Sequence, residues 1–233
     1  MAKPVETLPA VPARGGRTPR ETRPAREGSD ADARRALVLA AARVAFFELG
    51  LEGASLREIA KRAGYTPGAI YSYFASKEEV YGALLGESLE RLNEHVAASS
   101  PARKGSAPAL VRAKATAFFD FYRQNPRDLD LGFYLFHGMQ PRGLTPALNQ
   151  RLNARLRDAL APTSDALVAL GWHAQDAQTE VTALFAHIAG LLLLSHTGRI
   201  RMFHQESRAL FERYLDAMLA RAPAPPKTRG EQR

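Results

Sequence analysis

The sequence contains no cysteine and no long uninterrupted apolar segment. Without cysteine there is neither a disulfide framework nor a thiolate metal site, which fits a reducing cytoplasm. The longest apolar run, Ile188–Leu194, is far shorter than the ~20 residues that span a bilayer. The first residues are rich in proline and arginine and form no apolar stretch, so we expect no secretory signal. A cytoplasmic protein without a membrane partner is therefore expected.

The residue patterns that mark metal sites and catalytic centres are also missing from the sequence. No pair of histidines stands four apart around a glutamate, the spacing typical of a zinc site. Ser195 and His196 are adjacent, but no acid is marked that would orient the histidine as a base. We expect no metal, no cofactor and no enzymatic activity. The histidines, read as polar core or surface residues, are His95, His137, His173, His187, His196 and His204.

Positive charge is concentrated at the two ends of the chain. The net charge is +8, and residues 1–28 hold six basic and three acidic side chains while residues 221–233 hold four and one. Five prolines and no apolar periodicity predict disorder for residues 1–28, and a disordered basic tail is expected over residues 222–233. Such tails attract any polyanion.

Arginines recur at every third position of the N-terminal arm. In an extended, polyproline-like segment this period aligns them along one edge. An arm that follows DNA and a leader that only improves solubility both fit this pattern. These residues are Arg14, Arg17, Arg20, Arg23 and Arg26.

Helical periodicity begins at Asp30, and Gly50 is expected to end this first helix. The segment from Ser55 to Glu58 is a capping box that opens a second helix. Thr66 is suited to cap a short third helix, with a proline at its first position. A second capping box, residues 76–79, starts a long fourth helix that runs to about residue 98.

The remainder of the chain also has helical periodicity. Proline and glycine separate the expected helices, and Pro162 predicts a break in the third of them. No stretch alternates with period two for long enough to be a convincing strand. An all-α protein in two parts is expected, with a first domain over residues 29–82 and a second over residues 83–221. The later helices are expected at about 108–124, 127–138, 145–170, 175–197 and 205–221.

The short third helix has the features of a DNA-recognition helix. A helix, a tight turn containing glycine and a second short helix form a helix-turn-helix, whose second helix enters the major groove N-terminus first. Gly68 and Ala69 are small enough to let this end approach the bases. With Ile70 and Phe74 directed inward, the phenols of residues 71 and 73 lie on the two flanks, where they can bond phosphate oxygens. Packing alone also explains either tyrosine.

The segment SLREIAKRAGYTPGAIYSYFASKEEV, preceded by AAARVAFFELG, resembles the N-terminal domain of the TetR family of transcriptional regulators. The matching pattern includes Ile59-Ala60, Ala63-Gly64 and Ile70-Tyr71-x-Tyr73-Phe74, and it covers roughly residues 33–82. The resemblance implies groove, base or phosphate contacts for Ser55, Arg57, Thr66, Pro67, Gly68, Ala69, Tyr71, Tyr73 and Lys77.

Family members join this head, through the long helix, to an all-α body that dimerises and usually binds a small molecule. The last two long helices are apolar on two sides, so they require burial on two sides. The resemblance implies that they form a four-helix interface between two copies. The residues expected at this interface are Phe185, Ala189, Leu192, His196, Phe211, Tyr214, Leu215 and Met218.

Aromatic residues are concentrated in the middle of the chain, and an apolar pocket with a few polar groups is typical of a small-ligand site. A plain hydrophobic core explains such a cluster equally simply. The candidate pocket residues are Phe118, Phe121, Tyr122, Phe133, Phe136 and His137.

Together these features predict a DNA-binding transcriptional regulator. We expect a homodimeric repressor that binds a palindromic double-stranded operator and is released by a small-molecule effector. The alternative is a ligand-independent, DNA-binding architectural or assembly protein that uses the same head.

Overall fold

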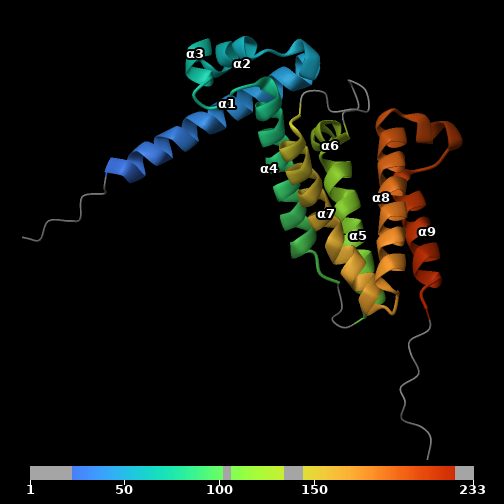
Figure 1. Ribbon diagram of the computed structural model, residues 1–233. Helices are drawn as coiled ribbons and strands as arrows, with labels where there is room; N and C mark the ends of the chain where they lie inside the picture. The colour runs from blue at the N-terminus through green and yellow to red at the C-terminus, as the bar shows by residue number, and fades with distance from the viewer. Residues whose placement is uncertain (1–22, 102–105, 134–143, 224–233) are drawn as a thin grey trace, which may run out of the picture.

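The structure is a computed structural model that describes residues 23–101, 106–133 and 144–223. The described part is helical and contains no strand, which confirms the expected all-α fold. A head of three helices is joined by the long helix α4 to a helical body (Figure 1). The elements are α1 (Arg23–Gly53), α2 (Leu56–Ala63), α3 (Pro67–Ile70), α4 (Lys77–Ala98), α5 (Ala107–Gln124), α6 (Pro126–Phe133), α7 (Pro146–Ala169), α8 (Ala174–His196), the 3-10 helix η1 (Arg199–Phe203) and α9 (Ser207–Ala220).

Helix α1 begins earlier than expected and is interrupted where expected. It starts at Arg23, so residues 23–28, which were assigned to a disordered arm, are helical. Pro24 lies in the first turn, where a missing N–H costs no intrahelical bond. Gly50 has φ 69° and ψ 171° and ends the regular helix, as predicted. The N-terminal part of α1 projects away from the body (Figure 1). The arginines at positions 14, 17 and 20 lie outside the described residues.

The head has a hydrophobic core of its own. Ile59 and Ile70 are fully buried, and Phe74 is 4% exposed. The inward assignment of Ile70 and Phe74 is therefore confirmed. They pack against the buried face of α1 and the first turns of α4, so α1, α2, α3 and the start of α4 share one core. A helix as short as α3 is marginal in water by itself and depends on this packing.

Helix α7 differs from its prediction, because it continues through Pro162 without a break. Proline removes the N–H that would bond the carbonyl of Asp158. Asp158 lies on the exposed side of α7, where water can solvate that carbonyl. Ala159 and Thr163, each 1% exposed, are packed inside the body and hold both halves of the helix in line.

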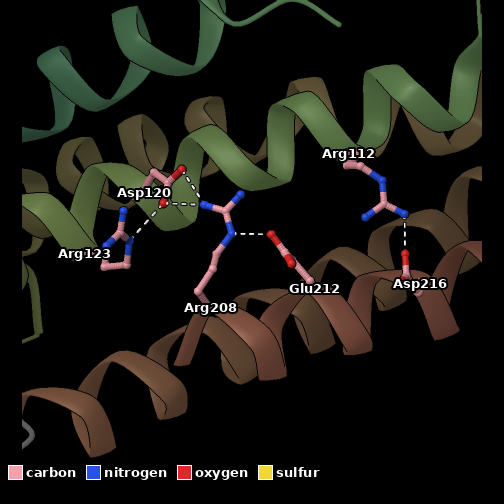
Figure 2. A network of polar contacts seen from close by, with 6 residues as sticks. All are labelled: Arg112, Asp120, Arg123, Arg208, Glu212 and Asp216. Atoms are coloured by element: carbon pink, nitrogen blue, oxygen red, sulfur yellow. Dashed lines mark hydrogen bonds and ion pairs between the residues drawn. The ribbon is translucent and has the colours of Figure 1, made fainter. Parts of the chain in front are cut away.

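Ion pairs fix α9 against α5 (Figure 2). Nη1 of Arg208 donates to both carboxylate oxygens of Asp120, at 2.9 and 2.8 Å. Nε of Arg208 donates to Glu212 on its own helix at 2.6 Å. Arg112 and Asp216 form a further pair between the two helices. These groups are partly exposed, so they add little stability each, but together they set the register of α9 along α5.

Helix α8 is long and apolar. By length and composition it could cross a bilayer, with a mean hydropathy of 1.4. The core helix of a soluble protein meets the same criterion. Its inner face is buried, with Val181, Leu184 and Ile188 each 1% exposed. Only 33% of its most apolar window is buried within the protomer, so apolar side chains also face outward.

Four of the eight residues expected at the dimer interface lie inside the protomer instead. Leu192, Phe211, Leu215 and Met218 are each 0% exposed and belong to the body core. Of the other four, three are half-buried and His196 is exposed. Neighbouring apolar stripes on one helix can both pack inside the same protomer. The spacing of apolar residues in the sequence does not show whether a stripe contacts its own chain or a second copy. The interface assignment of these four is therefore corrected to core.

Removing the ring at position 211 should destabilise the body strongly. Phe211 stacks on Phe119 with centroids 4.4 Å apart and planes 5° apart. Phe211→Ala leaves a cavity there and is expected to lower the free energy of unfolding by about 3–5 kcal/mol, measured by urea denaturation. Phe203→Ala, at a site that is 70% exposed, is the matched control, with an expected change below about 0.5 kcal/mol. Equal stability of the two variants would contradict the core assignment.

Candidate nucleic-acid interface

Side-chain caps hold the two helices of the helix-turn-helix at fixed starts. Oγ of Ser55 accepts the Glu58 N–H at 3.2 Å, and Oγ1 of Thr66 accepts the Ala69 N–H at 3.3 Å. Between them Gly64 adopts a left-handed conformation, φ 73°, that ends α2 and is accessible to glycine without a Cβ penalty. Local chemistry therefore determines both helix starts and the turn that separates them.

The two predicted capping boxes differ in the structure. At the start of α4 both side chains bond backbone N–H groups: Ser76 accepts the Glu79 N–H at 3.2 Å, and Glu79 accepts the N–H of Ala75, the residue before the cap, at 2.9 Å. At the start of α2 only the serine half forms. The Glu58 carboxylate instead accepts from Arg62 at 2.8 Å, and Arg62 also donates to Glu48 of α1 at 2.7 Å. This bridge orients α2 on α1.

The N-terminal end of α3 is open to the surroundings. Thr66, Pro67 and Gly68 are exposed, and a Cβ added at Gly68 would meet no atom within 4 Å. Ser55 and Arg57 are exposed at the first turn of the preceding helix. A small, exposed helix start beside an exposed arginine has the shape and charge that the major groove accepts.

The two tyrosines do not have equivalent surroundings. Tyr71 is 59% exposed, so its phenol can reach a phosphate as predicted. Tyr73 is half-buried and packs against the head core. The helical wheel placed both outward, but α3 ends at Ile70 and the following turn rotates Tyr73 toward the core. Tyr73 thus combines a packing role with its predicted phosphate contact, which stays a prediction.

Lys77 has a structural role that its sequence position did not indicate. Its Nζ donates to the carbonyl oxygens of Leu51 at 2.9 Å and Glu52 at 3.4 Å. These carbonyls follow the break at Gly50, so they lack helical partners. Lys77 therefore ties the end of α1 to the start of α4. Its contact with a phosphate stays a prediction.

The candidate pocket residues that can be described form packed core. Phe118 and Tyr122 are each 1% exposed, and their ring centroids are 5.4 Å apart. Phe121 is 6% exposed with its ring centroid 5.3 Å from that of Tyr122. Burial raises the pKa of the Tyr122 phenol, which stays neutral. None of these rings borders the two cavities described in this chain. Phe136 and His137 lie outside the described residues, as does the side chain of Phe133.

Comparison with known proteins agrees with this geometry. Residues 38–84 match the family model described as "Bacterial regulatory proteins, tetR family". The chain is 28% identical over 173 residues to the HTH-type transcriptional regulator TtgR of Pseudomonas putida, covering 72% of this chain and 82% of TtgR. This chain is a TetR-family DNA-binding transcriptional regulator.

Two further relatives of this TetR-family regulator differ in how far they match. The HTH-type transcriptional activator FasR of Mycolicibacterium smegmatis is 33% identical over 120 residues, which are 52% of this chain and 49% of FasR. The crystal structure of FadR from Bacillus subtilis in complex with stearoyl-CoA has a TM-score of 0.55 at 20% identity, and the match covers 81% of this chain and 98% of FadR. At this identity the likeness shows the fold alone.

Two groups of exposed apolar residues, among several in the described chain, bear on function although the sequence did not single them out. Leu193 and Leu194 are 38% and 40% exposed on α8. Phe47 of α1 is exposed beside Arg127 of α6. The apolar run at residues 188–194 was a usable signal for the first pair. No local signal exists for the second, because it depends on how α6 meets the head.

Adding a large side chain at Gly68 should weaken DNA binding without unfolding the head. Gly68→Leu meets open space and improves helix propensity, so the melting temperature is expected to stay the same or rise. The added side chain occupies the space that bases need, so affinity for duplex DNA by fluorescence anisotropy should fall at least about tenfold. The control is Ala98→Leu, an exposed site at the far end of α4. Undiminished DNA binding by Gly68→Leu would exclude groove entry by this end of α3.

Proposed function

We propose that this TetR-family regulator is a cytoplasmic homodimeric repressor that binds a palindromic operator and is released by a small-molecule effector. The exposed N-terminal end of α3 is the observation that carries operator binding. Its contacts are assigned to Thr66, Pro67, Gly68 and Ala69 at the bases. The supporting residues are Ser55 and Arg57 from α2 with Tyr71, Tyr73 and Lys77 at the phosphates.

The proposed dimer interface is the outward face of α8. Ala183, Ala186 and Gly190 follow one another at helical spacing and lead to the exposed Leu193 and Leu194. Small residues allow another helix to approach closely, and the two leucines add apolar area. In a symmetric dimer the same face of a second copy covers this one. Phe185, Ala189, Tyr214 and His196 stay candidates at its edges.

The effector part of the proposal is supported by one structural relative and opposed by one feature of the body. FadR of Bacillus subtilis was solved in complex with stearoyl-CoA, so a body of this fold can hold a ligand. In this chain Phe118, Phe121 and Tyr122 are packed together. That packing favours the alternative, a ligand-independent DNA-binding architectural or assembly protein.

Selection from a random duplex library with the purified protein should yield a palindromic sequence. Because the two recognition ends of a dimer contact successive turns of the duplex, we expect half-sites about one helical turn, ~10 bp, or a multiple of it apart. Footprinting maps both half-sites. A single half-site, or binding without sequence preference, would contradict the operator proposal. A compound screen for raised melting temperature and lowered operator affinity then separates the effector-released repressor from the alternative.

Charge placed on the outward face of α8 should separate the two copies. Leu193→Arg puts a guanidinium where an apolar contact is proposed, so light scattering with size-exclusion chromatography should show a soluble monomer with weakened operator binding. Val168→Arg, on α7 at a site that is 44% exposed, is a matched control and should stay dimeric. A dimeric Leu193→Arg variant would exclude this face as the interface.

A further inference from the structure

The head and the body have separate hydrophobic cores that meet at two bridging side chains. Phe46 of α1 and Leu131 of α6 are half-buried and pack against both clusters. Helix α4 runs between the cores, with Leu84 in the head core and Tyr81 in the body core. This meeting point, formed by α1, α4 and α6, is called the joint below.

The joint contains a partly open cavity of about 100 Å³. The apolar part of its lining consists of Phe46, Phe47, Leu51, Tyr81, Leu84 and Leu131, and the charged residues Arg43, Arg127, Asp128 and Asp130 complete it. An engineered apolar cavity of about 150 Å³ in another protein holds benzene. The joint cavity is smaller but partly open, so a small ring or a short branched alkyl group can enter it without being fully enclosed.

Charged groups around the joint already have partners within the protein. Asp128 of α6 accepts from Arg91 of α4 at 2.6 Å, and Arg43 of α1 donates to Glu87 of α4 at 3.2 Å. The guanidinium of Arg127 lies over the ring of Phe47, 4.4 Å from its centroid. A charged ligand would have to displace one of these contacts, so the joint favours an uncharged one.

The remaining carboxyl group at the joint, Asp130, also favours an uncharged ligand. Burial raises the pKa of the Asp130 carboxyl, and the nearby His196 opposes this shift in part, so the surroundings of Asp130 disfavour charge.

We propose that the joint cavity is a binding site for an uncharged, ring-sized apolar group, and that its occupation changes the angle between head and body. The site is separate from the aromatic core of the body, since Phe118, Phe121 and Tyr122 do not line it. The regulatory half of this inference rests on the proposed function, whereas the binding half does not.

The coupling follows from which elements form the walls. Phe46 and Phe47 lie on the last regular turn of α1 before Gly50, and Lys77 ties the segment after Gly50 to the start of α4. Arg127 and Leu131 belong to α6 of the body. A group placed between these walls separates α1 from α6 and so tilts the head relative to the body.

Toluene is a suitable probe of the cavity. In methyl-labelled full-length protein, its titration should give saturable NMR shifts at the methyl groups of Leu51, Leu84 and Leu131. The methyl groups of Leu152 and Leu167, in the body core, should not shift. Saturable shifts at the body core, or none up to the solubility limit of toluene, would overturn the proposal.

Two variants and one control assign the binding to the joint. Leu131→Phe fills the cavity and should weaken toluene binding at least about tenfold. Val168→Phe, at an exposed position of α7, should leave toluene binding unchanged. Phe47→Ala removes one wall of the cavity and should also weaken toluene binding. Because Phe47 is exposed, this variant should fold even if Leu131→Phe is too crowded to fold. Parent-like affinity in the Phe47→Ala variant would overturn the assignment.

The absence of cysteine makes the change of angle measurable. Nitroxide labels on the double variant Lys61→Cys of α2 and Val168→Cys of α7 report the head–body distance by pulsed electron paramagnetic resonance. Excess unlabelled protein is added so that few dimers contain two labelled copies, and the measured distance is then the one within a single chain. Toluene should shift this distance in the parent and not in Leu131→Phe or Phe47→Ala. An unchanged distance beside saturable methyl shifts overturns the regulatory half alone. Failure to bind any duplex would instead reject the proposed function and leave the joint site standing.

Discussion

The rest of the structure depends on the burial of α4 on two sides. Val80 and Leu84 belong to the head core, whereas Leu89 and Leu92 on the same helix belong to the body core. Because protein cores are close-packed, a rigid helix shared by two of them cannot shift in one without displacing side chains in the other. The position of the recognition end is therefore set by packing in the body as well as by the head itself.

Close contact between α4 and α7 reinforces this constraint. At Gly82 an added Cβ would lie 2.5 Å from a methyl carbon of Leu148, and at Gly86 it would lie 2.9 Å from the guanidinium of Arg155. Glycine at these positions lets α7 approach α4 closely. The arrangement agrees with a regulator in which the body determines where the head lies.

Most of the head could be predicted because its signals are local. Ser55, Thr66 and Ser76 cap the helices that follow them, and Gly50 and Gly64 end the helices that precede them. Each of these contacts spans four residues or fewer, so the sequence pattern contains both partners. The helices of the body could be predicted, but which of their faces are core and which are exposed could not. Apolar periodicity does not show which neighbour an apolar stripe will contact.

The sequence by itself determined the all-α class, the helix-turn-helix and the small residues at its tip, because helix propensity, capping and turn chemistry act between near neighbours. Only the tertiary structure decided that Leu192 and Phe211 are core while Leu193 faces outward, and that Lys77 binds carbonyl groups of α1. It also decided that Phe47 and Arg127, far apart in the chain, form one wall. Such contacts depend on the relative placement of whole helices, which no short stretch of residues encodes.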